Sequence, residues 1–279
     1  MTRWLVTGAG GQLGTHLVSL LPAEDVVGLT RADLDLTSAA DVGDVVHAIR
    51  PDVVINAAAY TGVDAAETDE PAAHAANAVA PGLLAAALAR HGGRLIHVST
   101  DYVFDGTGDR PYEPDDPTGP RTAYGRTKLA GEQAVLAALP DSYVVRSAWI
   151  YGGPGSNFVD TMVSLERSRD TVDVVADQVG SPTWVRDLAG ALIALSSASV
   201  PTRRLHYVNA GTASWFDLAQ EVFRAVGADP SRVRPVTSAQ FVRPAPRPAW
   251  SVLSTASWTA SGLGAPRDWR TALREHLGR

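Results

Sequence analysis

Short runs of β-branched and apolar residues alternate with longer alanine- and leucine-rich stretches along the first half of the chain. The short runs predict strands, and the longer stretches predict helices between them. The predicted strands cover Trp4–Thr7, Val26–Leu29, Val53–Asn56, Arg94–Ser99 and Tyr143–Ser147, and the predicted helices cover Gln12–Leu21, Ser38–Ile49, Pro71–Arg90 and Thr122–Leu139. This alternation indicates an α/β fold of the Rossmann type, a doubly wound parallel sheet covered by helices.

The alternation loosens after residue 150. Residues 151–157 are rich in glycine, and residues 230–248 are dense in proline and arginine. Two predicted helices, Arg186–Ser196 and Trp215–Val226, flank a predicted strand at Leu205–Asn209 that we expect to rejoin the main sheet. We therefore expect a dinucleotide-binding domain over residues 1–150 plus about 184–210, and a smaller, discontinuous C-terminal substrate-binding lobe over 151–183 and 211–279.

Composition narrows the class of protein. The 279 residues are 45% hydrophobic, enough to bury a substantial core. The absence of cysteine excludes disulfides, thiolate zinc sites and thiol catalysis, so any redox chemistry must come from a cofactor. A net charge of −6 argues against nucleic-acid and anionic-lipid partners, and no apolar run approaches membrane-spanning length. We expect a cytoplasmic protein without membrane contact, and no metal site because its histidines lack ligand spacing.

The first predicted strand runs into a glycine loop that opens a helix. Gly8, Gly11 and Gly14 are spaced G-x-x-G-x-x-G, and Gln12 and Leu13 begin the helix. Glycines let the backbone approach a pyrophosphate, and a helix N-terminus offers free N–H groups to an anion. A glycine-rich turn without a ligand has the same composition, but the position between the first strand and the first helix favours a dinucleotide.

The end of the second predicted strand bears on which dinucleotide binds. An acidic residue there favours NAD, whereas a basic one accommodates the 2′-phosphate of NADP. Thr30 and Arg31 occupy this place, so we expect NADP(H) to be preferred. Asp33 and Asp35 follow closely and keep NAD(H) possible.

Tyr124 and Lys128 lie four residues apart and share one face of a predicted helix. A phenol titrates near pH 10, so a neighbouring ammonium is expected to lower its pKa and make it a better proton donor. An exposed Tyr/Lys pair of this spacing also arises by chance. Ser99 and Thr100 end the fourth strand at the edge where ligands bind, and Thr100 is expected to hold a carbonyl oxygen, although Ser-Thr-Asp clusters also form ordinary turns.

Six ordered motifs resemble those of extended short-chain dehydrogenases/reductases, and within them the dTDP-4-dehydrorhamnose reductase family. The motifs span residues 56–64, 99–106, 124–132, 146–152, 177–183 and 247–251 and cover nearly the whole chain. The resemblance implies reduction of the 4-keto group of a nucleotide-activated 6-deoxyhexose by NAD(P)H.

The resemblance also implies a role for individual residues. Tyr124 would protonate the oxygen, Lys128 would hold the nicotinamide ribose, and Thr100 would hydrogen-bond the keto oxygen. Substrate contacts are expected from Val63, Thr100, Asp101, Tyr102, Tyr124, Trp149 and Arg247. Cofactor contacts are expected from Gly8, Gly11, Gln12, Leu13, Gly14, Arg31, Asp35, Leu36, Ala59, Tyr60, Thr61, Ser99, Tyr124 and Lys128.

Two positions distinguish subgroups of the resembling proteins. Related sugar dehydratases carry Thr-Asp-Glu where this chain has Thr100, Asp101 and Tyr102, so elimination of water is not expected. Some reductases carry a magnesium-binding glutamate where this chain has His16, so a magnesium-bridged dimer is not expected, and we predict a monomer or weak homodimer.

Three functions remain open. The foremost is conversion of dTDP-4-dehydro-L-rhamnose to dTDP-L-rhamnose. A 4-ketoreductase or streptose-type synthase of antibiotic deoxysugar biosynthesis would carry the same motifs. A non-catalytic subunit resembling the regulatory subunit of methionine adenosyltransferase is a different class, against which the intact Thr100, Tyr124 and Lys128 argue.

Overall fold

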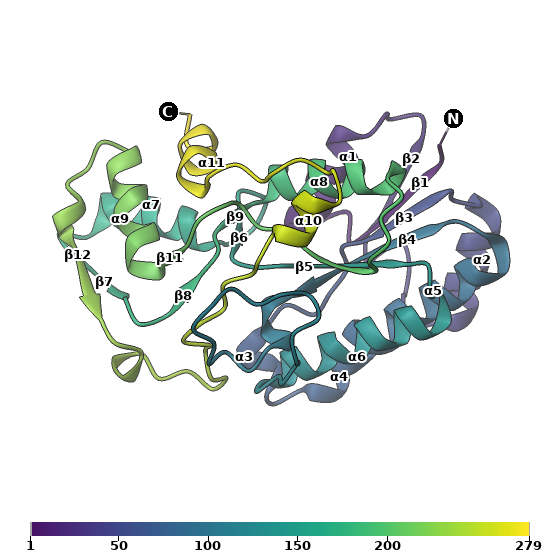
Figure 1. Cartoon of the computed structure of the whole chain (residues 1–279), viewed down its shortest axis with the longest axis horizontal. Coiled ribbons are helices and arrows are strands. Elements are labelled where there is room, and N and C mark those ends of the chain that lie inside the picture. The colour runs from purple at the N-terminus through teal and green to yellow at the C-terminus, as the bar shows by residue number, and fades with distance from the viewer. Residues whose placement is uncertain (1, 279) are drawn as a thin grey trace.

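A parallel sheet of six strands lies at the centre of residues 2–278, the part of the chain that the computed structural model describes (Figure 1). The strands are β1 Trp4–Thr7, β2 Val26–Leu29, β3 Val53–Asn56, β4 Arg94–Thr100, β5 Tyr143–Ser147 and β10 Arg204–His206. Their order is β10-β5-β4-β3-β1-β2, and every neighbouring pair is parallel. The winding reverses between β1 and β3, which makes the carboxyl ends of these two strands the expected ligand crevice.

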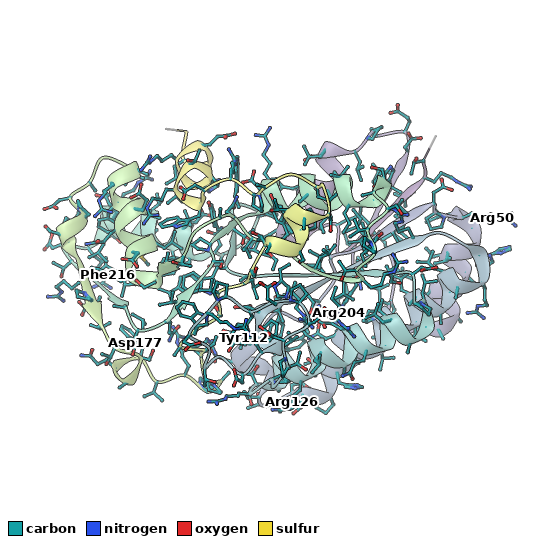
Figure 2. The ribbon with its side chains drawn as sticks, in the orientation of Figure 1. Arg50, Tyr112, Arg126, Asp177, Arg204 and Phe216 are labelled. Carbon is teal, nitrogen blue, oxygen red and sulfur yellow. The ribbon has the colours of Figure 1, made fainter. Side chains whose placement is uncertain are left out.

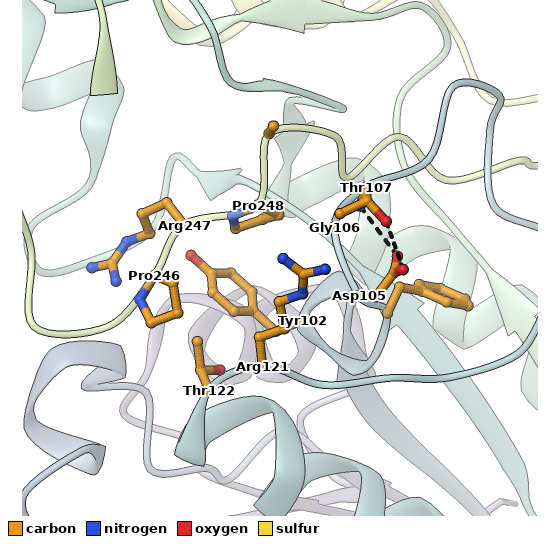
Figure 3. Close-up of a pocket in the computed structure, with 11 residues that line it drawn as sticks. Tyr102, Asp105, Gly106, Thr107, Arg121, Thr122, Pro246, Arg247 and Pro248 are labelled. Atoms are coloured by element: carbon orange, nitrogen blue, oxygen red, sulfur yellow. Dashed lines mark hydrogen bonds between the residues drawn. The ribbon is translucent and has the colours of Figure 1, made fainter. Parts of the chain in front are cut away.

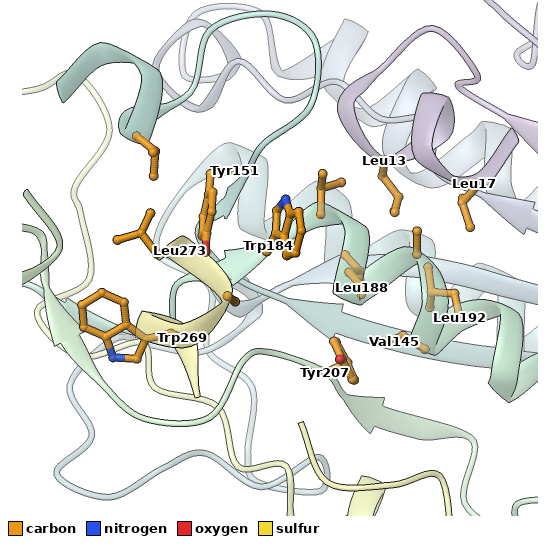
Figure 4. Packing of buried hydrophobic residues seen from close by; sticks show 14 of the residues in the cluster. Leu13, Leu17, Val145, Tyr151, Trp184, Leu188, Leu192, Tyr207, Trp269 and Leu273 are labelled. Carbon is orange, nitrogen blue, oxygen red and sulfur yellow. The ribbon is translucent and has the colours of Figure 1, made fainter. Parts of the chain in front are cut away.

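Helices cover both faces of this sheet, as predicted (Figure 1). Helices α1 Gln12–Leu20 and α8 Val185–Ser197 pack together on one face, and α2 Ala39–Ile49, α5 Ala80–His91 and α6 Ala123–Ala138 pack on the other. Figure 4 shows the first face, where leucines of α1 and α8 meet above the sheet. Strands β3 and β5 are buried along their whole length, which explains their continuous apolar sequence.

The helix predicted over residues 71–90 is interrupted. It consists of α4 Glu70–His74, a π-helical turn Ala75–Val79 and then α5. Pro81 has no N–H to donate to the carbonyl four residues earlier, so the hydrogen-bond ladder widens before it.

The combined stretch Glu70–His91 is long and apolar enough to cross a membrane, contrary to the expectation that no run would be. Its alanine content explains this, and half of its most apolar window is buried inside the protein. Helices α2 and α6 pack against α5, so the same residues serve as a core helix.

A smaller lobe is built from the segments that follow β5, and Figure 1 shows it beside the sheet. Helices α7 Phe158–Ser168 and α9 Trp215–Ala225 pack together beside the parallel pair β7 Val172–Val175 and β12 Val233–Val236. Two-residue strands also pair, namely β6 Ile150–Tyr151 with β9 Thr183–Trp184, and β8 Val179–Gly180 with β11 Ala213–Ser214. The remaining elements are α3 Val63–Ala66, α10 Ala256–Ala260, α11 Trp269–His276 and 3-10 turns at Asp101–Val103, Pro230–Arg232 and Ser238–Gln240.

The predictions for the second half are met in part. Helices α8 and α9 lie where two helices were predicted, and the strand expected at 205–209 joins the sheet edge beside β5 as β10. Helix α7 and the pair β7–β12 were not predicted. Figure 2 places Asp177 and Phe216 in the smaller lobe and Arg50 at the opposite end of the molecule.

Candidate active site

The glycine loop after β1 is held by close backbone contacts. A Cβ on Gly8, whose φ is 72°, would lie 2.7 Å from the backbone nitrogen of Ala58 in the segment after β3. A Cβ on Gly14 would lie 2.1 Å from the carbonyl oxygen of Gly8. Side chains at these positions would therefore push the loop away from β3 and from its own helix.

The start of α1 has the donors that an anion needs. Gly11 is the N-cap and has no side-chain capping bond, so the first N–H groups of α1 lack helical partners. The side chain of Leu13 is buried in the core, which leaves only its backbone for a ligand. Within residues 2–278, Gln12 Oε1 is buried without a hydrogen-bond partner. A cradle without side chains, free N–H groups and an orphaned polar atom fit a pyrophosphate.

A buried polar network fixes the neighbouring strand ends. Asn56 Oδ1 accepts from Thr7 Oγ1 at 2.7 Å and from the N–H of Ala58 at 3.1 Å. Asn56 Nδ2 lies 3.1 Å from His97 Nδ1, and burial holds the pKa of His97 well below its usual range. A neutral His97 accepts this bond, so β1, β3 and β4 are tied together beside the glycine loop.

The loop after β3 is clamped by Asn77, a residue that the sequence analysis missed. The N–H of Tyr60 donates to Asn77 Oδ1 at 2.8 Å, and Asn77 Nδ2 donates to the carbonyl of Tyr60 at 3.1 Å and to Thr127 Oγ1 at 3.1 Å. The clamp leaves Ala59 and Thr61 exposed. The expected cofactor-binding loop is thus fixed to α6.

The expected adenosine end of the crevice lies after β2. Arg31 is exposed, and within residues 2–278 it forms no ion pair. Asp35 Oδ1 accepts from the N–H and hydroxyl of Thr37 at 2.9 and 2.7 Å, which shapes its own turn, and Leu36 packs against the core. Arg31 therefore keeps a free guanidinium for a phosphate.

Helix α6 carries Tyr124 and Lys128 past the end of β4. Thr122 caps the helix by accepting from the N–H of Gly125, so Tyr124 lies in the first turn and Lys128 one turn later. Lys128 is buried, and its Nζ donates to the carbonyl of Val98 on β4 at 2.7 Å. Burial lowers the pKa of Lys128 to about 8, an effect that the nearby carboxylate of Glu132 opposes.

The expectation that Lys128 lowers the pKa of Tyr124 is wrong for this structure. Burial raises the pKa of Tyr124 to about 12, the nearby hydroxyl of Thr100 opposes this effect, and the charge of Asp101 adds to it. The ammonium of Lys128 donates to the backbone carbonyl of Val98 and not to the phenol. Tyr124 thus keeps its proton.

Thr100, Asp101 and Tyr102 surround this phenol. Thr100 Oγ1 donates to Asp101 Oδ1 at 2.9 Å, and within residues 2–278 Asp101 Oδ2 is buried without a partner. Burial raises the pKa of Asp101 to about 6. The ring of Tyr102 meets the ring of Tyr124 edge to face at 5.5 Å. Thr100, Asp101, Tyr102 and Tyr124 therefore lie together, and Lys128 follows one helical turn after Tyr124.

Ser99 has a different neighbour from the one expected. Its hydroxyl donates to Glu132 Oε1 at 2.5 Å, so only its backbone remains for a cofactor. Glu132 in turn accepts from Arg146 Nε and Nη2 at 2.8 and 2.7 Å. The side chains of Arg146 and Glu132 are only 2% and 1% exposed. Neither partner was singled out as a site residue from the sequence, although both lie in the quoted motifs.

Arg247 joins the smaller lobe to the sheet domain. Its Nη2 donates to Asp64 Oδ2 at 2.8 Å, where Asp64 follows Val63 at the start of α3. Figure 3 shows Arg247, Tyr102 and Arg121 around a cavity of about 150 Å³. Arg247, a predicted substrate contact, thus already pairs with an acidic side chain, and the guanidinium of Arg121 lines the same pocket.

Trp149 follows β5 and lies beside β8 of the smaller lobe, where its ring stacks on Trp215 at 3.5 Å. Within residues 2–278, no three histidine, aspartate or glutamate side chains gather closely enough to hold a metal ion. His16, where some resembling proteins have a magnesium ligand, places Nδ1 3.1 Å from the carbonyl of Gln12.

Comparisons with known proteins place the chain among nucleotide-sugar reductases. The model of a family described as the RmlD substrate binding domain matches residues 2–279. The chain is 55% identical to a probable dTDP-4,6-dihydroxy-2-methyloxan-3-one 4-ketoreductase of Streptomyces antibioticus, covering 98% of this chain and 94% of that one. It is 54% identical to a dTDP-4-dehydrorhamnose reductase of Mycobacterium tuberculosis, covering 99% and 92%. A crystal structure of dTDP-4-dehydrorhamnose reductase from Bacillus anthracis in complex with NADP is 36% identical, with a TM-score of 0.95 over 99% of this chain and 98% of that one.

Proposed function

Since this chain belongs to the protein family of the RmlD substrate binding domain, we propose that it is a nicotinamide-dependent reductase of the 4-keto group of a dTDP-4-keto-6-deoxyhexose. The foremost reaction is conversion of dTDP-4-dehydro-L-rhamnose to dTDP-L-rhamnose, the activity for which the Mycobacterium tuberculosis relative is named. One observation carries the proposal: Tyr124 lies against the hydroxyl of Thr100 at the carboxyl end of β4, and Lys128, one helical turn later, donates to the carbonyl of Val98 in the same strand.

The chain's own residues divide the work of the reaction. A reduced nicotinamide, when bound, supplies the hydride that the carbonyl carbon accepts. The backbone of the glycine loop and the start of α1 hold the pyrophosphate, and the clamped loop at Tyr60 borders the crevice. Lys128 holds the nicotinamide ribose, and its charge favours negative charge near Tyr124.

Tyr124 donates the proton to the carbonyl oxygen. With a pKa of about 12, its phenol stays protonated at neutral pH and is ready to act as the acid. The hydroxyl of Thr100 orients the same oxygen, because it lies at the end of β4 with its side chain turned toward Asp101 and Tyr124.

The sugar and its diphosphate occupy the space between the sheet edge and the smaller lobe. We assign sugar contacts to Val63, Asp101, Tyr102 and Trp149. Of these, Asp101 accepts from Thr100 and Tyr102 packs on Tyr124. Arg247 is assigned to the diphosphate. Asp64 keeps its guanidinium in place until a phosphate arrives.

The proposal is tested by NADPH oxidation with a panel of dTDP-4-keto-6-deoxyhexoses. Tyr124→Phe should lower turnover by about two orders of magnitude or more, while NADPH binding by fluorescence titration stays near that of the unsubstituted protein. Tyr207→Phe removes a hydroxyl from a core tyrosine packed on Trp258 and is the matched control. No turnover with any sugar of the panel would contradict the proposal and favour a non-catalytic role.

A second substrate is favoured by other relatives. The Streptomyces antibioticus relative is named for a 4-ketoreductase of a different keto-sugar, and a Streptomyces niveus relative, 49% identical, is named dTDP-4-keto-6-deoxy-D-glucose reductase. A reductase of antibiotic deoxysugar biosynthesis is therefore the alternative. The sugar with the highest kcat/KM in the panel distinguishes the two.

We further propose that NADP(H) is the preferred cofactor. The free guanidinium of Arg31 after β2 is suited to the 2′-phosphate that distinguishes NADP from NAD. Arg31→Glu should lower kcat/KM for NADPH by about tenfold or more and leave that for NADH nearly unchanged, since an ion pair with a phosphate becomes a repulsion. Arg90→Glu, which makes the same charge change on α5, is the matched control. A preference for NADH in the unsubstituted protein would refute this assignment.

A further inference from the structure

The indole of Trp149, a residue that follows β5 of the sheet domain, is held in a narrow slot of the smaller lobe. Trp149 follows β5 with a φ of 47°, a backbone conformation uncommon for a bulky residue. Its carbonyl accepts from the N–H of Thr183 at 3.2 Å, so the position of its backbone is fixed from the β9 side.

One face of the ring rests on the backbone of Gly180. A Cβ on Gly180 would lie 2.4 Å from Cε2 of Trp149 and 2.6 Å from both Cζ2 and Nε1. Nearly equal distances to three bonded atoms place this point above the ring rather than at its edge. Any side chain at residue 180 would displace the indole, because ring atoms cannot bend away.

The opposite face rests on Trp215. The two rings are stacked with centroids 3.5 Å apart and an interplanar angle of 4°. The three atoms nearest to a Cβ at Gly180 all belong to Trp149, so Trp215 must lie across the ring from Gly180. The indole of Trp149 is therefore enclosed on both faces.

A single small ladder sets the width of this slot. Gly180 in β8 pairs with Ala213 in β11, two residues before Trp215. Trp215 begins α9, whose capping box of Ser214 and Asp217 fixes the first turn. Phe158 packs behind Trp215 with ring centroids 4.6 Å apart. Both walls of the slot thus come from the smaller lobe and are built as one unit.

The backbone of Trp149 lies at the same sheet edge as the candidate site. Ser147, two residues before Trp149, pairs with Thr100 across β5 and β4, and Trp149 packs against the apolar cluster that includes Val103 and Phe104, the two residues after Tyr102. Trp149 is half-buried, and no hydrogen bond to its Nε1 is found within residues 2–278. With both faces covered, the indole has only its edge and its N–H left for a ligand.

We propose that Trp215 is a positioning residue for the sugar: it holds Trp149 in the orientation in which the indole edge and N–H meet the substrate. This inference rests on the proposed reductase function. The aromatic contacts of Trp215 are with Trp149 and Phe158, so it acts on the substrate through the stack. Without Trp215, the indole of Trp149 would be free to rotate about its side-chain bonds. Fixing it in one orientation on binding would then lower the affinity for the substrate.

Substitutions at Trp215 distinguish the effect of ring stacking from the effect of side-chain volume. Trp215→Leu should raise KM for the keto-sugar about three- to tenfold, the value of one lost aromatic stack. Trp215→Phe keeps a flat ring and should stay within about twofold of the unsubstituted protein. KM for NADPH should not change in either variant, because the cofactor loop is built from α1, β3 and α6. Trp258→Phe alters a buried tryptophan packed on Tyr207 instead and is the control for stability.

Two further measurements test the route through Trp149. The effects of Trp149→Phe and Trp215→Leu on KM should be less than additive in the double variant, since either change breaks the stack. Two stacked indoles also give an exciton couplet in circular dichroism, which should disappear in Trp149→Phe and Trp215→Phe and persist in Trp258→Phe.

The outcomes are distinguishable. If the unsubstituted protein turns over a keto-sugar and Trp215→Leu has the same KM, the inference is wrong and the proposed function stands. Additive effects in the double variant, or equal losses for Phe and Leu at residue 215, would also overturn it. If the unsubstituted protein reduces no keto-sugar, the proposed function fails and this inference fails with it.

Discussion

Replacing Arg146 with methionine should destabilise the protein strongly without touching the substrate. The guanidinium of Arg146 makes two hydrogen bonds to the carboxylate of Glu132 at 2.8 and 2.7 Å, and a third to the carbonyl of Pro114 at 3.0 Å. Methionine fills much of the same volume against Phe104 but carries no charge. The substitution therefore leaves a carboxylate, 1% exposed, without its cation.

The size of the expected loss in the free energy of unfolding follows from the burial of this ion pair. Breaking a buried ion pair by removing one partner costs about 3–5 kcal/mol, because the remaining charge cannot reach water. The nearby ammonium of Lys128 makes no hydrogen bond to Glu132 and donates to the carbonyl of Val98 instead. Ser99 continues to donate to Glu132 and reduces this loss only in part. Replacing both charges at once, as Arg146→Met with Glu132→Met, removes the uncompensated charge, so the double variant should be more stable than the single one.

Urea unfolding followed by circular dichroism measures both variants. The surface pair Arg110–Asp116 is the control, because its two contacts at 2.8 Å have the same geometry while the arginine side chain is 63% exposed. Arg110→Met should change the free energy of unfolding far less, since solvent screens the pair. An Arg146→Met variant that loses less than about 1 kcal/mol, or a double variant less stable than the single one, would refute the reasoning.

Two more outcomes are expected. The ammonium of Lys128, with a pKa of about 8, is lost as the pH rises through that value, so kcat/KM should fall above about pH 8. A profile that stays flat from pH 7 to about 9.5 would show that its charge is not needed. Gly14→Ala should weaken NADPH binding about tenfold or more, because its Cβ would lie 2.1 Å from the carbonyl oxygen of Gly8. Gly43→Ala, where nothing lies within 4 Å, is the control in the same fluorescence titration, and equal affinities would contradict the role of the loop.

The central sheet could be predicted because its signals are local. Strands β1, β2, β3 and β5 have the predicted bounds, since short apolar runs between turn residues define strands. Of these, β1, β3 and β5 are buried along their whole length. The smaller lobe could not be predicted in the same way. Its parallel pair β7–β12 joins segments about sixty residues apart, and its two-residue strands are too short to show a period.

The candidate site divides along the same line. Tyr124 and Lys128 were found from one helical turn of sequence, and Thr100 from the end of a strand. The partners of two other predicted residues were missed, because they are distant in the sequence: Glu132 meets Ser99 across 33 positions, and Asp64 meets Arg247 across 183. Contacts between residues so far apart in the sequence produce no recognisable spacing pattern, so they can be identified only from the folded structure.

Burial acts in opposite directions on the two groups that carry the chemistry. It raises the pKa of the Tyr124 phenol to about 12 and lowers that of the Lys128 ammonium to about 8, because each shift favours the uncharged form. Near pH 7 both groups nevertheless hold their protons. The carboxylate of Asp101, charged above about pH 6, adds to the first effect. The site therefore has a protonated acid and, one helical turn away, a buried cation, and proton transfer from Tyr124 becomes favourable only when an oxygen of rising negative charge lies next to both.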